Sequence, residues 1–223
     1  MSGSDSRPNV VNANEHHVAC LLLLDTSGSM DGVPITALNE AVNRFKFDLS
    51  GDDRTRKVMD IAVVEFNDTV NVIQDFCPIE QMQPVNLIAD GHTHMGPAVE
   101  LAVQMVRDRT HFLNKAGAQP HVPWIVLISD GAPYPSSYGI ETIAQVVRQR
   151  EEEKKLLFWC FGVQGYDRAT LQKLAPERTI ELAGYDFRSL FEWLYKSMAV
   201  VSQSVVGQSV TVVAPPAAFT IPS

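Results

Sequence analysis

Short apolar runs alternate along this chain with longer segments in which apolar residues recur every three or four positions. Residues 18–24 are an unbroken apolar run that ends at Asp25, and residues 124–129 are a second, mainly apolar run that is followed by Asp130. Runs of this length are typical of strands that are buried on both faces of a sheet. Further strands are expected at residues 156–163 and near residues 179–182.

The segments between these runs show the spacing of amphipathic helices. After the first strand, five apolar residues share one helical face, and Pro34 stands in the first turn, where proline is tolerated. These five residues are Ile35, Leu38, Val42, Phe45 and Leu49. Further helices are expected at residues 97–113, 140–147, 169–174 and 190–198, and the charged run at residues 151–155 is expected to be a solvated helix end.

One pair of strands is predicted to form a hairpin. Residues 59–66 and 70–76 flank Asn67-Asp68-Thr69, a pattern that is typical of a tight turn between antiparallel strands. Strands that alternate with helices predict a mostly parallel sheet covered on both faces. The predicted fold is therefore α/β, with residues 18–24 and 124–129 as central parallel strands and residues 70–76 as one antiparallel edge strand.

The chain is expected to form one domain. Its 223 residues fit one large domain or two small ones at about 150 residues per domain, and no linker or internal repeat interrupts the pattern. We expect the domain to cover residues 16–203, preceded by a flexible segment at residues 1–15. Residues 204–223 carry no charge and are expected to be a C-terminal tail or a late edge strand.

Composition and charge exclude several classes of protein. Apolar residues make up 45% of the chain and charged residues 20%, as in soluble globular proteins, and the net charge is −8. A nucleic-acid-binding surface needs a basic stripe, and the sequence has no dense cluster of Lys and Arg. The most apolar run, residues 18–24, is far shorter than the roughly 20 residues that a membrane-spanning helix needs.

The cysteines and the N-terminal residues bear on localisation. Cys20, Cys77 and Cys160 each lie inside an apolar run, and we expect them to be buried free thiols of a reducing compartment. Residues 1–14 lack the basic start of a signal peptide. We therefore expect a cytoplasmic protein with no nucleic-acid and no membrane partner.

Two aspartates stand where ligands bind in an open parallel sheet. Asp25 and Asp130 follow apolar strands, and ligands bind beyond the carboxyl ends of such strands. Asp25 is followed by two hydroxyls, Ser27 and Ser29, which a tight loop through Gly28 can turn back toward the strand end. Carboxylate and hydroxyl oxygens are the ligands that Mg²⁺ prefers. The same string is also ordinary turn and helix-cap chemistry, so a purely local structural role is the alternative.

Two further features favour the metal site over the turn. Asp130-Gly131 repeats the arrangement of a strand followed by a carboxylate, and Thr93 lies in a loop just before a predicted helix. The same loop holds His92 and His94, whose imidazoles suit Zn²⁺ or Ni²⁺. Alternate residues of an extended loop point to opposite sides, so we expect both histidines on the rim or in solvent, with ligation of a softer metal as the alternative.

Three sequence elements resemble, in the same order, those of a von Willebrand factor type A domain with a metal-ion-dependent adhesion site. They are Asp25-x-Ser27-x-Ser29, Gly91-x-Thr93-x-x-Gly96 and Ser129-Asp130-Gly131, and the resemblance runs over about residues 18–202. It implies a three-layer, Rossmann-like fold and a bound Mg²⁺, which Mn²⁺ or Ca²⁺ can replace. It also implies the metal ligands, which are the hydroxyls of Ser27, Ser29 and Thr93 and the carboxylates of Asp25 and Asp130, bound directly or through water.

Within that family, residues 23–30 and the helix start at Pro34-Ile35 resemble the bacterial tellurium-resistance Y-type proteins. The resemblance implies a non-enzymatic adaptor module of a bacterial stress-response system. The partner would be another protein that completes the metal coordination with an Asp or Glu carboxylate. A protein kinase and phosphatase pair, or a ring ATPase, is the kind of partner that the resemblance implies.

The chain departs from the Y-type pattern at two places on the rim of the site. One is the pair of histidines in the Thr93 loop. The other is residues 131–136, Gly-Ala-Pro-Tyr-Pro-Ser, where acidic residues or Thr are usual. Tyr134 in this stretch is either an anchor for the partner or a half-buried loop residue. Both departures bear on which partner the site recognises.

An enzyme is the alternative to a binding module. A phosphotransferase of the haloacid-dehalogenase type also places a carboxylate after a buried strand and uses Mg²⁺. Such an enzyme has a second Asp two positions later to transfer the proton, whereas this chain has Ser27, whose hydroxyl is no general acid. The sequence also lacks a Gly-x-Ser-x-Gly elbow, a nucleotide-binding P-loop and a Gly-x-Gly-x-x-Gly fingerprint. These absences favour the non-enzymatic binding module.

Overall fold

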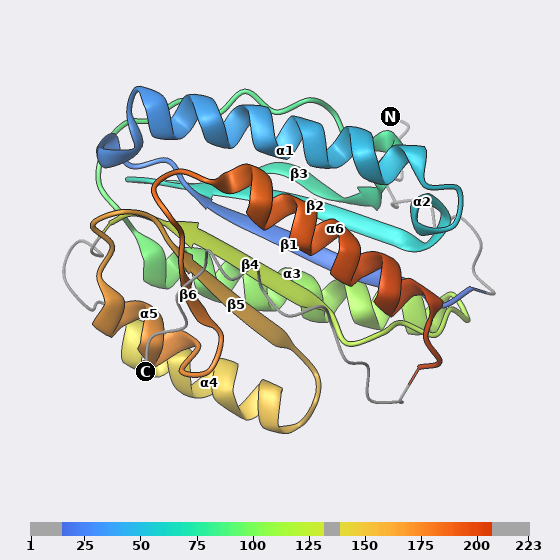
Figure 1. Ribbon diagram of the computed structural model, residues 1–223. Coiled ribbons are helices and arrows are strands. Elements are labelled where there is room, and N and C mark those ends of the chain that lie inside the picture. The colour runs from blue at the N-terminus through green and yellow to red at the C-terminus, as the bar shows by residue number, and fades with distance from the viewer. Residues whose placement is uncertain (1–14, 132–138, 207–223) are drawn as a thin grey trace, which may run out of the picture.

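The computed structural model describes residues 15–131 and 139–206. Within these residues, six strands form one sheet in the order β3-β2-β1-β4-β5-β6, with β3 antiparallel to β2 and every other neighbouring pair parallel (Figure 1). The predicted α/β fold with one antiparallel edge strand is therefore confirmed. The strands are β1 (Val18–Asp25), β2 (Met59–Phe66), β3 (Val70–Pro78), β4 (Trp124–Ser129), β5 (Leu157–Gly162) and β6 (Thr179–Glu181).

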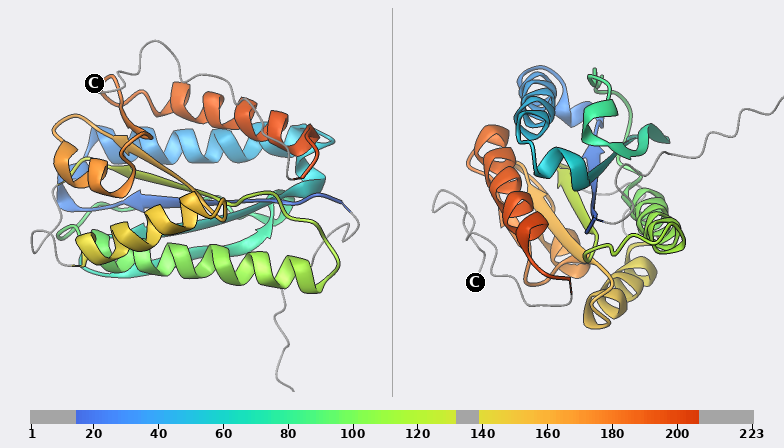
Figure 2. Two further views of the ribbon diagram at one scale, coloured as in Figure 1. Left: turned by 90° about the horizontal axis from the view of Figure 1, so that it is seen from below. Right: turned by 90° about the vertical axis from the view of Figure 1, so that its right-hand side faces the viewer.

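Helices cover both faces of this sheet (Figure 2). The apolar sides of α1 and α6 pack on one face, and those of α3, α4 and α5 pack on the other. The α-helices are α1 (Val33–Gly51), α2 (Thr55–Val58), α3 (Met95–Lys115), α4 (Ile140–Glu152), α5 (Arg168–Leu174) and α6 (Phe187–Gln203). Two 3₁₀ turns, η1 (Gly28–Met30) and η2 (Ile79–Gln81), complete the elements of the described residues.

Strand β1 is buried along its whole length because both faces of the sheet are covered. Leu22 and Leu24 belong to the core on the side of α1 and α6, and Leu21 and Leu23 to the core on the side of α3 and α4. Full burial of such a side chain contributes about 1.5–3 kcal/mol to folding. The apolar strand thus fixes its last residue, Asp25, at the centre of one end of the sheet.

That end of the sheet contains the point where the strand order reverses. Strands β1 and β4 are neighbours, with Leu24 beside Ile128, and the chain moves outward from β1 to β2 on one side and from β4 to β5 on the other. In open α/β sheets, ligands bind in the crevice beyond the carboxyl ends of the two strands at such a point. The fold therefore offers a binding site next to the last residues of β1 and β4.

The connection between β3 and α3 has no counterpart in the sequence patterns. Residues 82–94 form no regular element, and two asparagines of α1 hold the first part of this segment in place. Asn39 donates to Leu87 O at 2.9 Å and accepts from Leu87 N at 2.7 Å, and Asn43 makes the equivalent pair of bonds with Val85. Each asparagine side chain bonds both the N–H and the C=O of one residue, as a neighbouring strand would. The segment leads directly into the Thr93 loop.

Two smaller expectations have definite outcomes. The three cysteines are buried free thiols, as predicted. The expectation of a solvated helix end at residues 151–155 is wrong for Glu151, whose side chain is 13% exposed and accepts bonds from Phe158 N and Arg178 Nη1, both at 2.9 Å. Glu151 bonds to the start of β5 because α4 and β5 are joined by a tight turn.

Some predictions concern residues that the structure does not describe. The expected flexible start lies almost wholly within residues 1–14, and most of the expected tail or late edge strand within residues 207–223, all outside the described residues. Tyr134 is outside them as well, and the limits of the domain at residues 16–203 stay a prediction. Among residues 15–131 and 139–206, no helix combines the length and the apolar character needed to cross a bilayer.

Candidate functional site

Asp25 is the last residue of β1, and its carboxylate is completely buried. Its Oδ1 accepts a hydrogen bond from Ser27 N at 2.9 Å, and its Oδ2 accepts one from Ser129 Oγ at 2.5 Å. Ser129 is the last residue of β4, so the two central strands are joined through this carboxylate. Burial raises the pKa of Asp25 to about 6, although the bonds from Ser129 and Ser27 lower it; the nearby charge of Asp130 raises it further.

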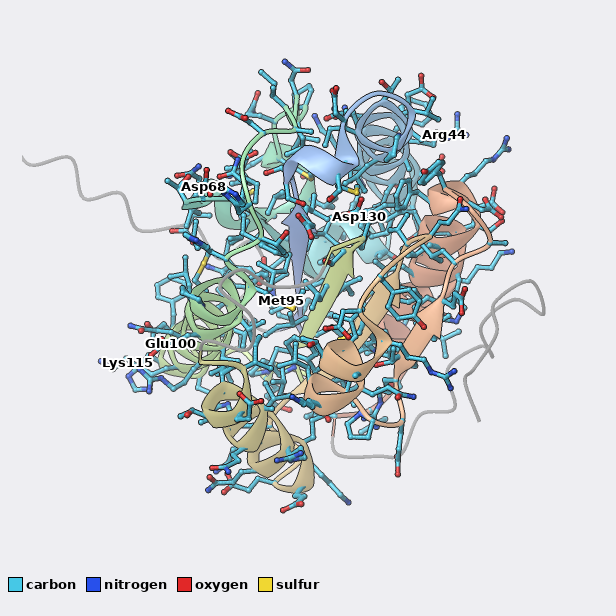
Figure 3. All side chains as sticks on the ribbon, turned by 90° about the vertical axis from the view of Figure 1, so that its left-hand side faces the viewer. Arg44, Asp68, Met95, Glu100, Lys115 and Asp130 are labelled. Carbon is cyan, nitrogen blue, oxygen red and sulfur yellow. The ribbon has the colours of Figure 1, made fainter. Side chains whose placement is uncertain are left out.

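The hydroxyls that follow Asp25 lead across the site to the second carboxylate. The turn η1 brings Ser29 Oγ to 3.1 Å from Ser27 Oγ. Ser29 Oγ in turn donates to Asp130 Oδ1 at 2.9 Å. Burial raises the pKa of Asp130, and the bond from Ser29 opposes this shift. Ser29 is exposed and Asp130 half-buried, so the cluster opens to solvent on this side (Figure 3).

Thr93 joins the cluster from a separate loop. A Cβ atom added at Gly131 would lie 2.8 Å from Thr93 Oγ1, 3.6 Å from Asp25 Oδ2 and 3.7 Å from Ser27 Oγ. Three oxygens from two separate loops therefore converge beside the Cα of Gly131, and only a residue without a side chain leaves the space between them open. The structure thus brings all five predicted residues into one cluster.

Backbone hydrogen bonds fix the loops that carry these side chains. Gly28 N donates to Gly91 O, and Asp90 N donates to Thr26 O, both at 2.9 Å. These two bonds tie the loop after β1 to the loop before α3. A Cβ atom at Gly28 would lie 3.3 Å from Gly91 O, so the close approach of the two loops also depends on a glycine. Ser27 and Thr93 are consequently held at a fixed spacing.

His92 of the Thr93 loop pairs with a carboxylate outside the cluster. His92 Nδ1 lies 2.8 Å from Asp68 Oδ1, and the bonds from His92 lower the pKa of Asp68. Within the described parts of the chain, no group of three or more His, Cys, Asp or Glu side chains is arranged to hold a metal ion. The alternative of a soft-metal site built on His92 and His94 therefore gains no support from the described residues.

The donor set fits a hard divalent cation. All five side chains offer oxygen, and two of them are carboxylates. In the described residues, the partners of these carboxylates are hydroxyls and a backbone N–H, with no Lys, Arg or His among them. Residues 132–138 contain no Lys, Arg or His in their sequence either. Two partly desolvated negative charges without a cationic side chain are the electrostatic setting of a metal site.

Sequence reasoning missed two contributors to this geometry. In the sequence, Ser129 is only a member of the Ser129-Asp130-Gly131 motif, yet its hydroxyl holds Asp25. Gly131 belongs to the same motif, and its missing side chain creates the space between the three oxygens. The signal for both was their position directly beside Asp130 after a buried strand.

Known structures share this fold at low sequence identity. The von Willebrand factor type A protein from Catenulispora acidiphila is 16% identical, with a TM-score of 0.62 over 83% of this chain and 43% of that chain. The vWF domain of the type V pili tip protein Mfa5 from Porphyromonas gingivalis is 11% identical, with a TM-score of 0.64 over 87% of this chain and 99% of that chain. At such identities the likeness concerns the fold alone.

A third similar structure is proximal thread matrix protein 1 from the mussel byssus with a zinc-occupied MIDAS motif, where MIDAS stands for metal-ion-dependent adhesion site. It is 17% identical, with a TM-score of 0.55 over 86% of this chain and 46% of that chain. The chain spans less than half the length of the mussel and Catenulispora chains. A search among curated proteins found no match. The family model described as "von Willebrand factor type A domain" matches residues 21–190, most of the chain, and the protein therefore belongs to the von Willebrand factor type A domain family.

Proposed function

We propose that this chain is a protein-binding module whose partner docks through a divalent cation held by Asp25, Ser27, Ser29, Thr93 and Asp130. Domains of this family generally mediate metal-dependent protein interactions and are typically not enzymes. The observation that carries the proposal is the convergence of two carboxylates and three hydroxyls at the carboxyl end of the sheet, without a cationic side chain among their described partners.

Mg²⁺ is the ion that we propose for the site, with Mn²⁺ or Ca²⁺ as ions that can replace it. Oxygen ligands of mixed charge suit these hard cations better than softer metals. The zinc-occupied motif of the mussel protein supports occupation of such a site by a divalent ion, and Zn²⁺ therefore belongs among the ions to compare.

The proposed partner is another protein that presents an Asp or Glu carboxylate. A cation bound mainly by neutral hydroxyls supplies a residual positive charge and an exchangeable coordination position to that carboxylate. The chain itself carries a net charge of −8, so an acidic partner is repelled when the site holds no cation. This charge makes docking conditional on the metal and disfavours nucleic acid as a partner.

The biological setting is proposed from the resemblance of residues 23–30 to tellurium-resistance Y-type proteins. It favours a bacterial, cytoplasmic stress-response system, in which a kinase and phosphatase pair or a ring ATPase would be the partner. The phosphotransferase alternative is disfavoured because Ser27 stands where such an enzyme needs its second Asp, and its hydroxyl already contacts Ser29.

Calorimetric titration of metal-free protein with Mg²⁺ tests the proposal. The wild type is expected to bind one ion, and Asp25→Ala is expected to bind none while keeping its fold. Asp108→Ala is the matched control, because it removes the same charge from an exposed position on α3. Absence of Mg²⁺ binding by the wild type, or unchanged binding by Asp25→Ala, would refute the metal site.

A further inference from the structure

The turn of the β2–β3 hairpin lies against the loop that carries Thr93. His92 N donates to Asp68 Oδ1 at 3.0 Å, and His92 Nδ1 lies 2.8 Å from the same oxygen. On the other side of Thr93, His94 N donates to Asn67 O at 2.9 Å. Thr93 is therefore bracketed by bonds to two consecutive residues of a turn that no sequence motif connects with the site.

Asp68 also occupies the space beside Gly91. Gly91 has a φ of +70°, and a Cβ atom there would lie 2.7 Å from Asp68 Cγ. A side chain at position 91 is thus excluded by the backbone conformation and by the Asp68 carboxylate together. Since Gly91 O accepts the bond from Gly28 N, the loop is held between the hairpin turn on one side and the Asp25–Ser29 loop on the other.

Hydrogen bonds within the turn and strand pairing on both sides of it hold the turn in place beside the Thr93 loop. Asn67 Oδ1 accepts from Thr69 N at 3.0 Å, and the strands on either side pair directly, with Phe66 beside Val70. The Asp68 side chain is 53% exposed, so its replacement leaves the apolar core intact. Figure 3 shows Asp68 at the same end of the molecule as Asp130, on the side of the hairpin.

We infer that Asp68 is a positioning residue, which holds the loop of residues 90–94 so that the Thr93 hydroxyl faces the same point as Asp25 and Ser27. This inference rests on the proposed metal site. The Thr93 hydroxyl comes from a loop with no regular structure, so its place in the donor set depends on what the loop is bonded to. Residues that orient metal ligands in this way strongly affect metal affinity although they do not touch the ion.

Calorimetric titration of the metal-free full chain with Mg²⁺ tests the role of Asp68. Asp68→Ala is expected to weaken Mg²⁺ binding by about 10-fold, the lower end of the effect of losing such a partner. Asp68→Asn keeps an oxygen acceptor for His92 N and is expected to restore most of the affinity. Asp108→Ala removes the same charge from an exposed place on α3 and is expected to bind Mg²⁺ as the wild type does.

The double variant separates positioning from a general effect of charge or stability. If Asp68 acts through Thr93, Asp68→Ala adds no further loss of affinity to Thr93→Ala. Gly91→Ala, whose new methyl group would press on the Asp68 carboxylate, is a second way to separate the loop from the turn and is expected to weaken Mg²⁺ binding as well. Thermal unfolding in metal-free buffer shows which variants are folded.

Each contrary result has a distinct meaning. A wild type that binds Mg²⁺ together with an Asp68→Ala variant of equal affinity overturns the positioning role and leaves the metal site standing. The same conclusion follows if Asp68→Asn is as weak as Asp68→Ala, or if the losses in the double variant add. A wild type that binds no Mg²⁺ overturns the proposed function and this inference with it.

Discussion

Asp60 and Asp25 lie at opposite ends of the same sheet, both almost fully buried, and their partners differ in kind. At the amino end, Asp60 forms an ion pair with Arg109, with Nε at 3.2 Å and Nη2 at 3.0 Å, and His17 Nδ1 lies 3.1 Å away. At the carboxyl end, the described partners of Asp25 are two serines, which donate a hydroxyl and a backbone N–H.

The difference separates a structural charge from one that is available for binding. A buried carboxylate that only stabilises the fold is best matched by a cation of the same chain, as Arg109 matches Asp60. Asp25 is held in place by its hydrogen bonds. Burial destabilises its ionised form, and no cationic side chain among its described partners neutralises the charge. Among the described residues, the carboxyl end therefore supplies no cationic side chain for this carboxylate, and the proposed cation would supply that charge.

The largest expected effect is the loss of the cation at the amino end. Arg109→Met leaves Asp60 buried without its main counter-charge and is expected to lower the free energy of unfolding by about 3–5 kcal/mol. Denaturant unfolding measures this loss. Mg²⁺ affinity is expected to stay unchanged, because the ion pair lies at the other end of the sheet. A loss below about 1 kcal/mol would contradict the structural role assigned to the pair.

A somewhat smaller effect concerns pH at the carboxyl end. The pKa of Asp25 is raised to about 6 from 3.8, so the folded metal-free protein binds this proton more tightly than the unfolded chain does. The resulting stability is present below pH 3.8 and is lost as pH rises through about 6. Relative to Asp25→Asn, which cannot titrate, the wild type is expected to lose about 3 kcal/mol between acidic and neutral pH.

Denaturant unfolding of both proteins in metal-free buffer across this pH range measures the difference. The raised pKa of Asp130 acts in the same direction in both proteins, so the comparison isolates Asp25. A constant difference between wild type and Asp25→Asn from acidic to neutral pH would contradict the desolvated, uncompensated state of this carboxylate.

Added Mg²⁺ is expected to stabilise the protein only through the proposed site at the carboxyl end of the sheet. At a hundredfold excess of Mg²⁺ over its dissociation constant, the wild type gains about 2.7 kcal/mol. Arg109→Met is expected to show the same gain from its lower starting point, whereas Asp25→Ala gains nothing and is no less stable than the metal-free wild type at neutral pH. Thermal melts with EDTA and with Mg²⁺ measure these gains. Identical wild-type melts would count against the site.

The fold was predictable because its signals are local. The apolar runs of β1 and β4 and the periodic faces of α1 and α3 require no knowledge of distant residues, and the two strands appear within one residue of their expected limits. The path of the first part of residues 82–94 was not predictable, since it depends on bonds from Asn39 and Asn43 of α1. No pattern marks two asparagines as partners of a segment more than 40 residues away.

The candidate site likewise has one part that the sequence predicts and another that it does not. The three motifs that contain Asp25, Thr93 and Asp130 pointed to one cluster because each follows a strand or precedes a helix at the same end of a parallel sheet. The support from Asp68 was hidden, because the residue stands in an ordinary hairpin turn and meets His92 only in the folded chain. The pairing of Asp60 with Arg109 was hidden for the same reason.

The smallest and most specific effect is a difference of about 10-fold between the losses of partner affinity and of Mg²⁺ affinity. Thr93→Ala is expected to weaken Mg²⁺ binding by about 10-fold and partner binding by about 100-fold, because a hydroxyl that binds the ion through its oxygen still has a hydrogen to donate to the docked carboxylate. The ionised Asp25 carboxylate has no hydrogen to donate and serves the ion alone, so Asp25→Ala abolishes both kinds of binding together. Thr142→Ala, which removes an exposed hydroxyl on α4, is the matched control.

The measurement is the affinity of a partner identified by co-purification, determined with Mg²⁺ and with EDTA for the wild type and both threonine variants. Since the chain is acidic, a partner carboxylate gains its attraction only from the bound cation. Binding of the wild type at full strength in EDTA would therefore refute the metal bridge, and equal losses of Mg²⁺ and partner affinity in Thr93→Ala would show that Thr93 acts on the metal alone.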